Sequence, residues 1–219
     1  MGISKKKLWG IYKWFLRIID PFPHIRYAKQ RRFLFIHIPK NAGTSVLKAL
    51  GIQFRHHSDC AVFEASDPAL FRNCYKFCFV RNPYDRLVSV YTYLQGGGAG
   101  KVDKEFAELV KSYPDFESFV LNYLNEYNIH EHVLLKPQYL FIYGFNGDLK
   151  VDYIGRFENL EGDFGVVAEK IGVKKRLTKY NASKRKNYAE YYTDALYSKV
   201  SRLYKRDFEL FGYEITNGE

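Results

Sequence analysis

Residues 33–50 combine a buried strand, a tight turn and the start of a helix. The run from Phe33 to Ile38 is predominantly apolar, which is typical of a strand covered on both faces in a parallel sheet. A turn is expected over residues 39–45, and a helical pattern begins at Val46. Because parallel strands must be joined by crossover elements that cover the sheet, this pattern favours an α/β fold.

A second unit of the same kind begins at Tyr75. Residues 75–80 indicate another buried strand, after which Asn82 can cap a helix and Pro83 suits its first position. That helix is expected to run to about Tyr93 and to stop at three consecutive glycines. Two successive strand–helix units predict neighbouring parallel strands with right-handed crossovers.

The rest of the chain continues the alternation of strands and helices. Residues 103–128 have a mainly helical pattern, and Asn159 is placed to cap a later helix. Strands are expected over 141–143 and 151–157, and helices over 161–171 and 188–210. The whole pattern predicts one α/β domain with a central parallel sheet.

Length and charge divide the chain into two parts. With 219 residues it has room for one compact domain, which we place at 31–219, after an N-terminal helix and linker at 1–30. Residues 1–32 contain nine Lys or Arg and one acid, and the apolar positions of 8–19 follow helical spacing. This segment resembles a basic amphipathic helix, so residues 5–19 could contact an anionic membrane peripherally, or dock on their own domain.

The three cysteines and the basic charge restrict location and partners. An odd number of cysteines at this spacing predicts free thiols rather than a disulfide framework, which suits a reducing cytoplasm. No apolar run is long enough to span a bilayer, so we expect a cytoplasmic protein, which could lie peripherally on the inner face of the membrane. No known reader motif accompanies the charge of +10, and nucleic acid is not an expected partner.

The turn after the first strand has the composition of an anion-binding loop. Gly43 permits close approach of the backbone, Lys40 adds a positive charge, and Thr44 and Ser45 add hydroxyl donors. Lys40 comes three residues before Gly43, whereas a nucleotide triphosphatase loop has lysine after its second glycine. A kinase or nucleotide triphosphatase is therefore the weaker alternative, and a purely structural turn with a surface lysine is the other.

The start of the second helix offers a second anion site. Arg81 follows its strand directly, at the sheet edge where open α/β folds bind ligands. Ser89 lies on the following helix, and its hydroxyl could bind a phosphate together with Arg81. Arg86 could either share that task or support the loop from behind.

Together the two segments resemble the sulfotransferases that depend on 3'-phosphoadenosine-5'-phosphosulfate (PAPS), in particular their carbohydrate (family 2 type) branch. The match covers about residues 33–213 and implies a P-loop-like, three-layer domain with a central parallel sheet. It also implies in-line sulfuryl transfer without a metal, with Lys40 stabilising the leaving group. The residues that would bind PAPS are Lys40, Asn41, Ala42, Gly43, Thr44, Ser45, Arg81 and Ser89.

The resemblance leaves the general base and the acceptor contacts less defined. His57 is the preferred base, followed by His56 and then Glu64, because relatives place a histidine or glutamate between the two motifs. His130 and His132 are the other candidates, and His132 is expected in the acceptor cleft, although the spacing after it departs from the family pattern. Lys184 and Arg185 could close over the nucleotide, contact an acidic acceptor, or form a solvated charge run.

The expected acceptor is a hydroxyl of a glycan, in bacterial polysaccharide biosynthesis. We expect no metal, because Cys74 and Cys78 lack two further ligands nearby. The alternative from outside enzymology is an anion-binding module that associates with membranes through its basic N-terminus.

Overall fold

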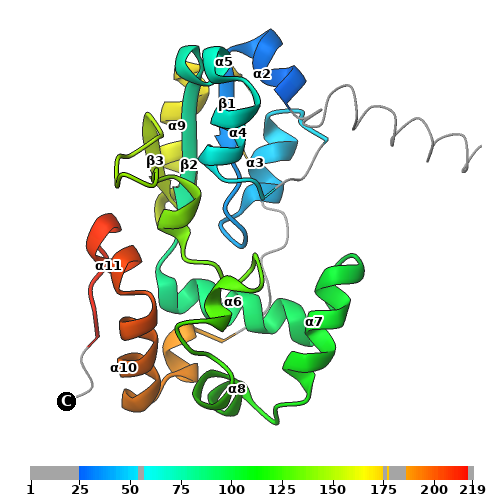
Figure 1. Cartoon of the computed structure of the whole chain (residues 1–219), viewed down its shortest axis with the longest axis vertical. Helices are drawn as coiled ribbons and strands as arrows, with labels where there is room; N and C mark the ends of the chain where they lie inside the picture. The colour runs from blue at the N-terminus through cyan, green and yellow to red at the C-terminus, as the bar shows by residue number, and fades with distance from the viewer. Residues whose placement is uncertain (1–24, 54–56, 175–176, 178–185, 217–219) are drawn as a thin grey trace, which may run out of the picture.

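The sheet is parallel and lies at the centre of one half of the molecule (Figure 1). A computed structural model describes residues 25–53, 57–174, 177 and 186–216 of the chain. Within them the sheet has three strands in the order β1-β2-β3, with bounds Phe33–Ile36, Tyr75–Val80 and Tyr153–Arg156. Phe33 is in register with Tyr75, and Phe77 with Tyr153, so β2 is the central strand. The predicted central parallel sheet is confirmed.

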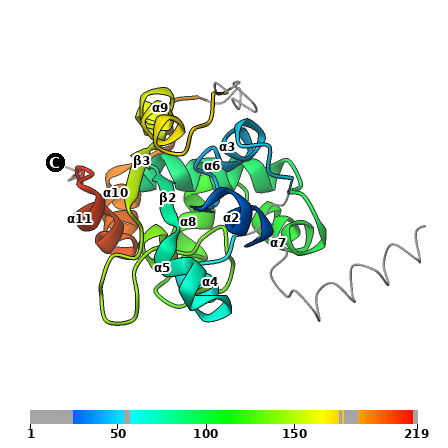
Figure 2. The same ribbon diagram turned by 90° about the horizontal axis from the view of Figure 1, so that it is seen from above.

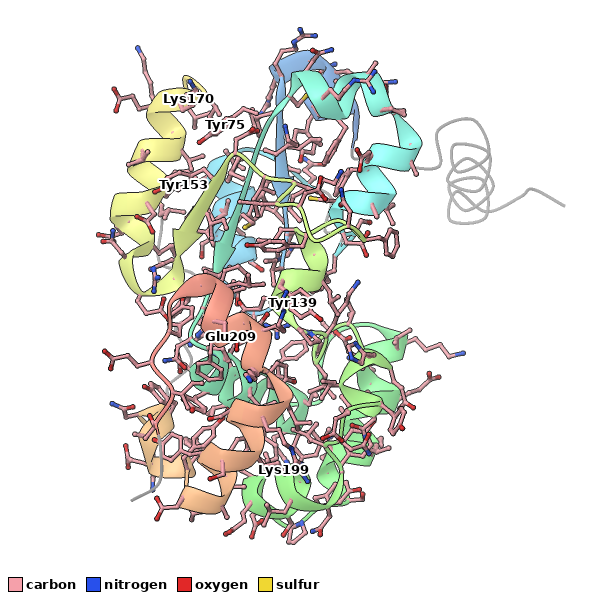
Figure 3. All side chains as sticks on the ribbon, turned by 60° about the vertical axis from the view of Figure 1, so that its left-hand side comes forward. Tyr75, Tyr139, Tyr153, Lys170, Lys199 and Glu209 are labelled. Carbon is pink, nitrogen blue, oxygen red and sulfur yellow. The ribbon has the colours of Figure 1, made fainter. Side chains whose placement is uncertain are left out.

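Successive side chains of each strand point to opposite faces of the sheet. One of these faces carries the phenylalanines. Phe35, Phe77 and Phe79 pack against α3 (Gly43–Ala49) and α9 (Leu160–Lys170). On the edge of this layer, Lys170 of α9 lies near the ring of Tyr75, as Figure 3 shows. The repeated aromatic positions therefore hold both helices on one side of the sheet.

The opposite face is covered by three helices that the sequence pattern did not predict. They are α2 (Ile25–Arg31), α4 (Cys60–Ser66) and α5 (Pro68–Asn73), which pack on Ile36 and Cys78. Figure 2 shows α4 and α5 on one side of β2, with α3 and α9 on the other. The domain thus has the predicted three layers, helix–sheet–helix.

A group of helices lies beyond the carboxyl ends of the strands (Figure 1). It comprises α6 (Pro83–Gln95), α7 (Lys101–Lys111), α8 (Phe116–Asn122) and α10 (Asp194–Leu203), around one apolar core. As predicted, the Asn82 side chain accepts a hydrogen bond from the amide of Tyr84 at the start of α6. These helices form a layer that faces the carboxyl ends of the strands.

The predicted strand over 141–143 is wrong. Residues Gln138–Phe141 form the 3-10 helix η2, and Tyr143 makes only an isolated bridge to Leu149. Phe141 and Ile142 are fully buried against the face covered by α2, α4 and α5. The apolar run therefore reflects burial by packing, which a short sequence window cannot distinguish from strand pairing.

The predicted helix over 188–210 is divided. The pieces are η4 (Tyr188–Tyr191), α10 and α11 (Lys205–Phe211), and the chain bends at Tyr204, where φ is −108° and ψ is 21°. The bend lets the Tyr204 hydroxyl donate to the Leu135 carbonyl. It also places α11 beside Tyr139, where the two halves of the molecule meet (Figure 3). Tertiary contacts, not local preference, end the helix here.

Two smaller departures concern helix ends. The predicted helical stretch 103–128 is split between α7 and α8 and continues into η1 (Asn128–His130). Asn159 ends η3 (Phe157–Asn159) and precedes α9, but its amide donates to Asp163 and does not cap the helix. The predicted positions of these elements are right, while their boundaries follow the packing.

The N-terminal segment 1–24 lies outside the described residues, and its contact with a membrane through 5–19 stays a prediction. In the part of the chain that the structure describes, no helix is both long and apolar enough to cross a bilayer. The three cysteines are free and buried, as predicted.

Candidate functional site

The loop between β1 and α3 is shaped by two residues with left-handed backbone. Lys40 has a φ of 68° and Ala42 a φ of 61°, which is uncommon for residues other than glycine. Alternation between left- and right-handed residues turns successive amides toward one point and forms a concavity for anions. The amides of Gly43 and Thr44 belong to the first turn of α3 and so lack intrahelical acceptors. The backbone therefore offers donors where the sequence predicts anion binding.

The ring of His37 lies directly against Gly43. A Cβ atom at Gly43 would come within 1.8 Å of His37 Nε2. His37 is 7% exposed and also stacks on Phe35, with ring centroids 5.6 Å apart. Glycine is required here because the ring occupies the space that any side chain would need.

Replacing Gly43 with alanine is expected to lower the free energy of unfolding by about 1–3 kcal/mol, since the ring must move to admit the methyl group. Urea unfolding measures this change. Gly165→Ala is the matched control, because Gly165 is an exposed helical residue and no atom lies within 4 Å of the place that its added methyl group would take. An equal effect of the two substitutions would show that the His37 contact does not restrict Gly43.

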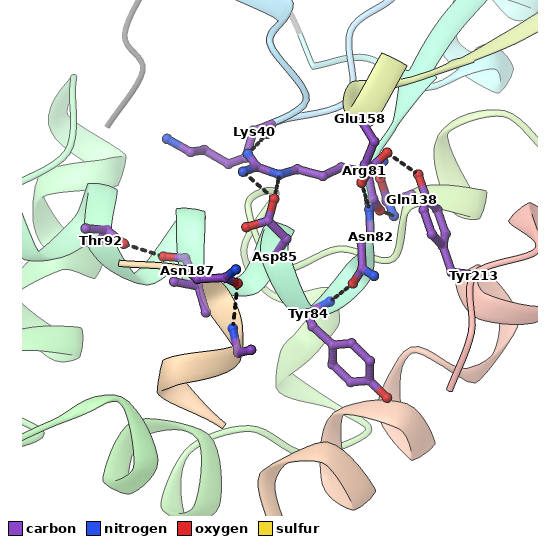
Figure 4. Close-up of polar contacts among 12 residues, drawn as sticks. Lys40, Arg81, Asn82, Tyr84, Asp85, Thr92, Gln138, Glu158, Asn187 and Tyr213 are labelled. Atoms are coloured by element: carbon purple, nitrogen blue, oxygen red, sulfur yellow. Dashed lines mark hydrogen bonds and ion pairs between the residues drawn. The ribbon is translucent and has the colours of Figure 1, made fainter. Parts of the chain in front are cut away.

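Lys40 and Arg81 meet at the carboxyl ends of neighbouring strands. Arg81 Nη1 donates to the backbone oxygen of Lys40 at 2.9 Å, and Lys40 Nζ lies 4.0 Å from the centroid of the Tyr93 ring. Figure 4 shows the Arg81 side chain between the Lys40 backbone and Asp85. The two predicted anion sites thus share one edge of the sheet and touch directly.

Arg81 is held in place on three sides. Its Nε and Nη2 atoms contact Asp85 Oδ2 at 2.7 and 2.6 Å, and its guanidinium lies 3.8 Å from the centroid of the Phe157 ring. Ser89 is half-buried on α6, one turn after Asp85. A fixed guanidinium beside a hydroxyl-bearing helix face can bind a phosphate without much reordering.

Arg86 supports the loop from behind. It is 3% exposed, and it donates to the carbonyl oxygens of Pro39 and Leu134, both at 3.1 Å. Burial lowers the pKa of its guanidinium, while Tyr204 and Asp207 act in the opposite direction. Of the two interpretations of Arg86 from sequence, these contacts match support of the loop.

Gln138 is a buried junction that the sequence analysis did not identify as functional. Its Oε1 accepts from Asn41 Nδ2 at 2.7 Å and from the Arg81 amide at 3.0 Å, and its Nε2 donates to the Arg81 carbonyl. The Gln138 amide donates to Asp207. Burial raises the pKa of Asp207 to about 6, although hydrogen bonds from the backbone of Gln138 and Tyr139 lower it.

No local signal marks Gln138, because its partners are far along the chain. Its place directly after Pro137 is compatible with any short turn. Asp85, by contrast, could have been found, since it lies four residues after Arg81 and one helical turn before Ser89.

His57 is the predicted base that the structure places beside the loop. Its Nδ1 lies 3.0 Å from the His37 carbonyl oxygen, and the two rings have centroids 4.3 Å apart. A carbonyl oxygen only accepts, so Nδ1 carries the proton in the neutral ring and Nε2 carries the lone pair. His56 lies outside the described residues, and His130 is exposed on η1.

Glu64 is placed elsewhere. Its carboxylate pairs with Lys150 Nζ at 3.2 to 3.3 Å and lines a surface hollow with Pro68 and Phe145. No residue of the loop 37–45 lines that hollow. The structure therefore does not bring Glu64 together with Lys40.

His132 is buried between α7 and the segment that precedes η2. Its ring stacks on Phe106 with centroids 4.2 Å apart, and its Nδ1 accepts from the Leu134 amide at 3.3 Å. Nε2 lies 3.7 Å from Asp103 Oδ1. Burial lowers the pKa of His132, while Asp103 acts to raise it.

Lys184 and Arg185 lie outside the described residues, so their predicted contacts stay predictions. Among the residues that the structure does describe, no group of three His, Cys, Asp or Glu side chains could hold a metal ion.

The chain is similar in sequence to known proteins over most of its length. The model of the sulfotransferase family matches residues 23–214. A protein named carbohydrate sulfotransferase 14 from Danio rerio is 25% identical over 240 aligned residues, which cover 89% of this chain and 63% of that protein. The mouse protein of the same name is 25% identical over 181 residues, covering 67% of this chain and 46% of that protein.

A third relative is an uncharacterized protein of Archaeoglobus fulgidus. It is 35% identical over 112 residues, covering 49% of this chain and 76% of that protein. This chain spans 63% and 46% of the lengths of the two carbohydrate sulfotransferases.

Proposed function

This chain belongs to the sulfotransferase family, and from that membership we propose that it transfers a sulfuryl group from PAPS to a hydroxyl of a carbohydrate. The observation that carries the proposal is the hydrogen bond between Arg81 and the backbone of Lys40, which joins two anion sites at one sheet edge. PAPS carries two separate anionic groups on one ribose, the phosphosulfate at the 5' position and a phosphate at the 3' position. A donor of this kind fits two adjacent sites better than a ligand with one charged group does.

Each site would bind one of these two anionic groups. The loop residues Lys40 to Ser45 would hold the 5'-phosphosulfate through backbone amides, the lysine ammonium and the two hydroxyl groups. Arg81 and Ser89 would hold the 3'-phosphate. Lys184 and Arg185, which lie outside the described residues, are proposed to close over the nucleotide or to contact an acidic acceptor.

The transfer is an in-line displacement at sulfur. The acceptor oxygen forms a bond to sulfur while the bond from sulfur to the bridging oxygen breaks. The electron pair of the broken bond stays on the 5'-phosphate of the leaving nucleotide. The Lys40 ammonium stabilises this developing charge, and such stabilisation is often the largest single contribution to catalysis.

The acceptor hydroxyl must lose its proton during the transfer. His57 is suited to accept it at Nε2, because the His37 carbonyl fixes the proton of the neutral ring on Nδ1. His56 is the second candidate by its position in the chain. The base then carries the proton until it exchanges with water.

A glycan acceptor is supported by the names of the Danio rerio and mouse relatives. His132 is proposed to lie on the acceptor side, since its ring stacks on Phe106 of α7, the helix whose Asp103 contacts Tyr93 beside Lys40. We propose a bacterial polysaccharide as the acceptor class and a cytoplasmic location.

Calorimetry with adenosine 3',5'-bisphosphate tests the donor assignment. Binding is expected to be about 10–100-fold tighter than for adenosine 5'-monophosphate, because charge-assisted hydrogen bonds to the 3'-phosphate are lost with the latter. The measurement is made with and without Mg²⁺. Equal affinities for the two nucleotides would contradict the assignment of Arg81, and magnesium-dependent hydrolysis of ATP would favour a kinase or nucleotide triphosphatase.

A further inference from the structure

Four side chains from four segments connect the loop to the helices beyond the strand ends. Lys40 Nζ lies over the Tyr93 ring of α6, and the Tyr93 hydroxyl donates to Asp103 Oδ2 at 2.6 Å. Asp103 belongs to the first turn of α7, and its other oxygen faces His132 Nε2 at 3.7 Å. Each oxygen of the Asp103 carboxylate thus faces a different partner.

The hydroxyl of Tyr93 determines how its ring is oriented. A hydrogen bond of 2.6 Å to a carboxylate is charge-assisted and stronger than a neutral one. With the hydroxyl held at Asp103, the ring cannot swing away from Lys40. Donation to an anion also makes the ring more electron-rich, which favours a cation over its face.

His132 completes the chain from the other side. Its Nδ1 accepts from the Leu134 amide, so the neutral ring carries its proton on Nε2, which faces Asp103. Nε2 is buried and has no hydrogen-bond partner among the described residues. At 3.7 Å it is somewhat farther from Asp103 than an ordinary hydrogen bond, which is about 2.9 Å. Asp103 Oδ1 is the carboxylate oxygen that this buried nitrogen faces.

We propose that Tyr93, Asp103 and His132 are positioning residues that hold the Lys40 ammonium at the mouth of the loop, a role that rests on the proposed function. A lysine side chain has many rotamers, and ordering it during the reaction would slow the transfer. Tyr93 supplies a face on which the ammonium is ordered in advance. Asp103 fixes that face by accepting from the Tyr93 hydroxyl, and the second oxygen of Asp103 faces His132 Nε2.

The test compares Tyr93→Phe and Asp103→Asn with the wild-type chain in transfer of labelled sulfate from PAPS. Tyr93→Phe keeps the ring and removes its tether, and Asp103→Asn removes the charge that strengthens the tether. Both are expected to lower kcat about 10-fold, comparable to the ordering of one lysine side chain, while the donor KM changes less than about twofold. The double variant is expected to match either single one, because both act on the same contact.

Matched controls separate positioning from loss of structure. Tyr113→Phe removes a hydroxyl from a half-buried ring in the same helical core, and Glu105→Gln neutralises an exposed carboxylate of α7. Both are expected to keep the wild-type kcat. In a Lys40→Ala background, Tyr93→Phe should have no further effect, whereas general damage to the fold would lower the residual rate again.

A second readout does not depend on turnover. Acetylation of Lys40, followed by mass spectrometry, is expected to be several-fold faster in Tyr93→Leu than in wild type, because the ammonium loses its contact with the aromatic ring. Faster labelling in a chain that transfers no sulfate would uphold the positioning role and reject the proposed function. Unchanged labelling, or wild-type kcat in Tyr93→Phe and Asp103→Asn, would overturn the positioning role even where the wild-type chain is active.

Discussion

Replacing Lys40 with alanine is expected to lower the rate of sulfuryl transfer by about 10²–10³-fold, the usual effect of removing one group that stabilises charge in a transition state. The loss should appear in kcat, because the charge on the bridging oxygen develops only as the bond to sulfur breaks. Alanine retains a Cβ, so the left-handed backbone at position 40 is strained to the same degree in both chains. Initial rates with labelled PAPS and a glycan acceptor measure the change.

Lys48→Ala is the control for this variant. Lys48 is exposed on α3, within the same strand–loop–helix unit, and carries the same charge. It is expected to retain the wild-type rate. If Lys40→Ala and Lys48→Ala gave the same rate, the ammonium of Lys40 would have no part in the chemistry.

Replacing Arg81 with alanine is expected to affect both the fold and the donor site. Asp85 would lose its partner in a pair whose side chains are only 7% and 15% exposed. Removing one member of a buried pair typically costs about 3–5 kcal/mol of unfolding free energy. The same change removes the charged donor assigned to the 3'-phosphate, so binding of adenosine 3',5'-bisphosphate should weaken by roughly 10–100-fold.

The double variant Arg81→Ala/Asp85→Asn separates these two effects. Neutralising Asp85 removes the uncompensated charge, so most of the lost unfolding free energy should return, as measured by urea unfolding. Bisphosphate binding should stay weak, because the guanidinium is still missing. Arg202→Ala serves as the control, since its ion pair with Glu126 is exposed and such pairs contribute little. Wild-type bisphosphate affinity in the double variant would assign Arg81 a structural role alone.

The strand–loop–helix units could be predicted from sequence because their signals are local. The apolar runs before Pro39 and Arg81, the cap at Asn82 and the glycine at 43 all lie within a few residues of the structure that they determine. His57 lies beside the loop, against the His37 carbonyl oxygen, and its role as the base stays a prediction.

The supporting contacts could not be predicted, since they join residues far apart in the chain. Gln138 and Asp207 carry no motif of their own, and their function depends on the path of intervening segments. The predictions of an unbroken helix through Tyr204 and of a strand over 141–143 are wrong for the same reason. In both, tertiary packing overrides a local preference that the sequence expresses clearly.

The contacts of Gln138 determine when, during synthesis, the site around the loop can form. The Lys40 loop leaves the ribosome early. Its Asn41 contacts Gln138, which is synthesised 97 residues later, and Gln138 contacts Asp207, which follows after another 69 residues. Contacts of such separation form late, because long loops must close first. The nascent chain therefore contains the predicted anion-binding sequence long before the contacts around it are complete, and we expect donor binding only after α11 has docked.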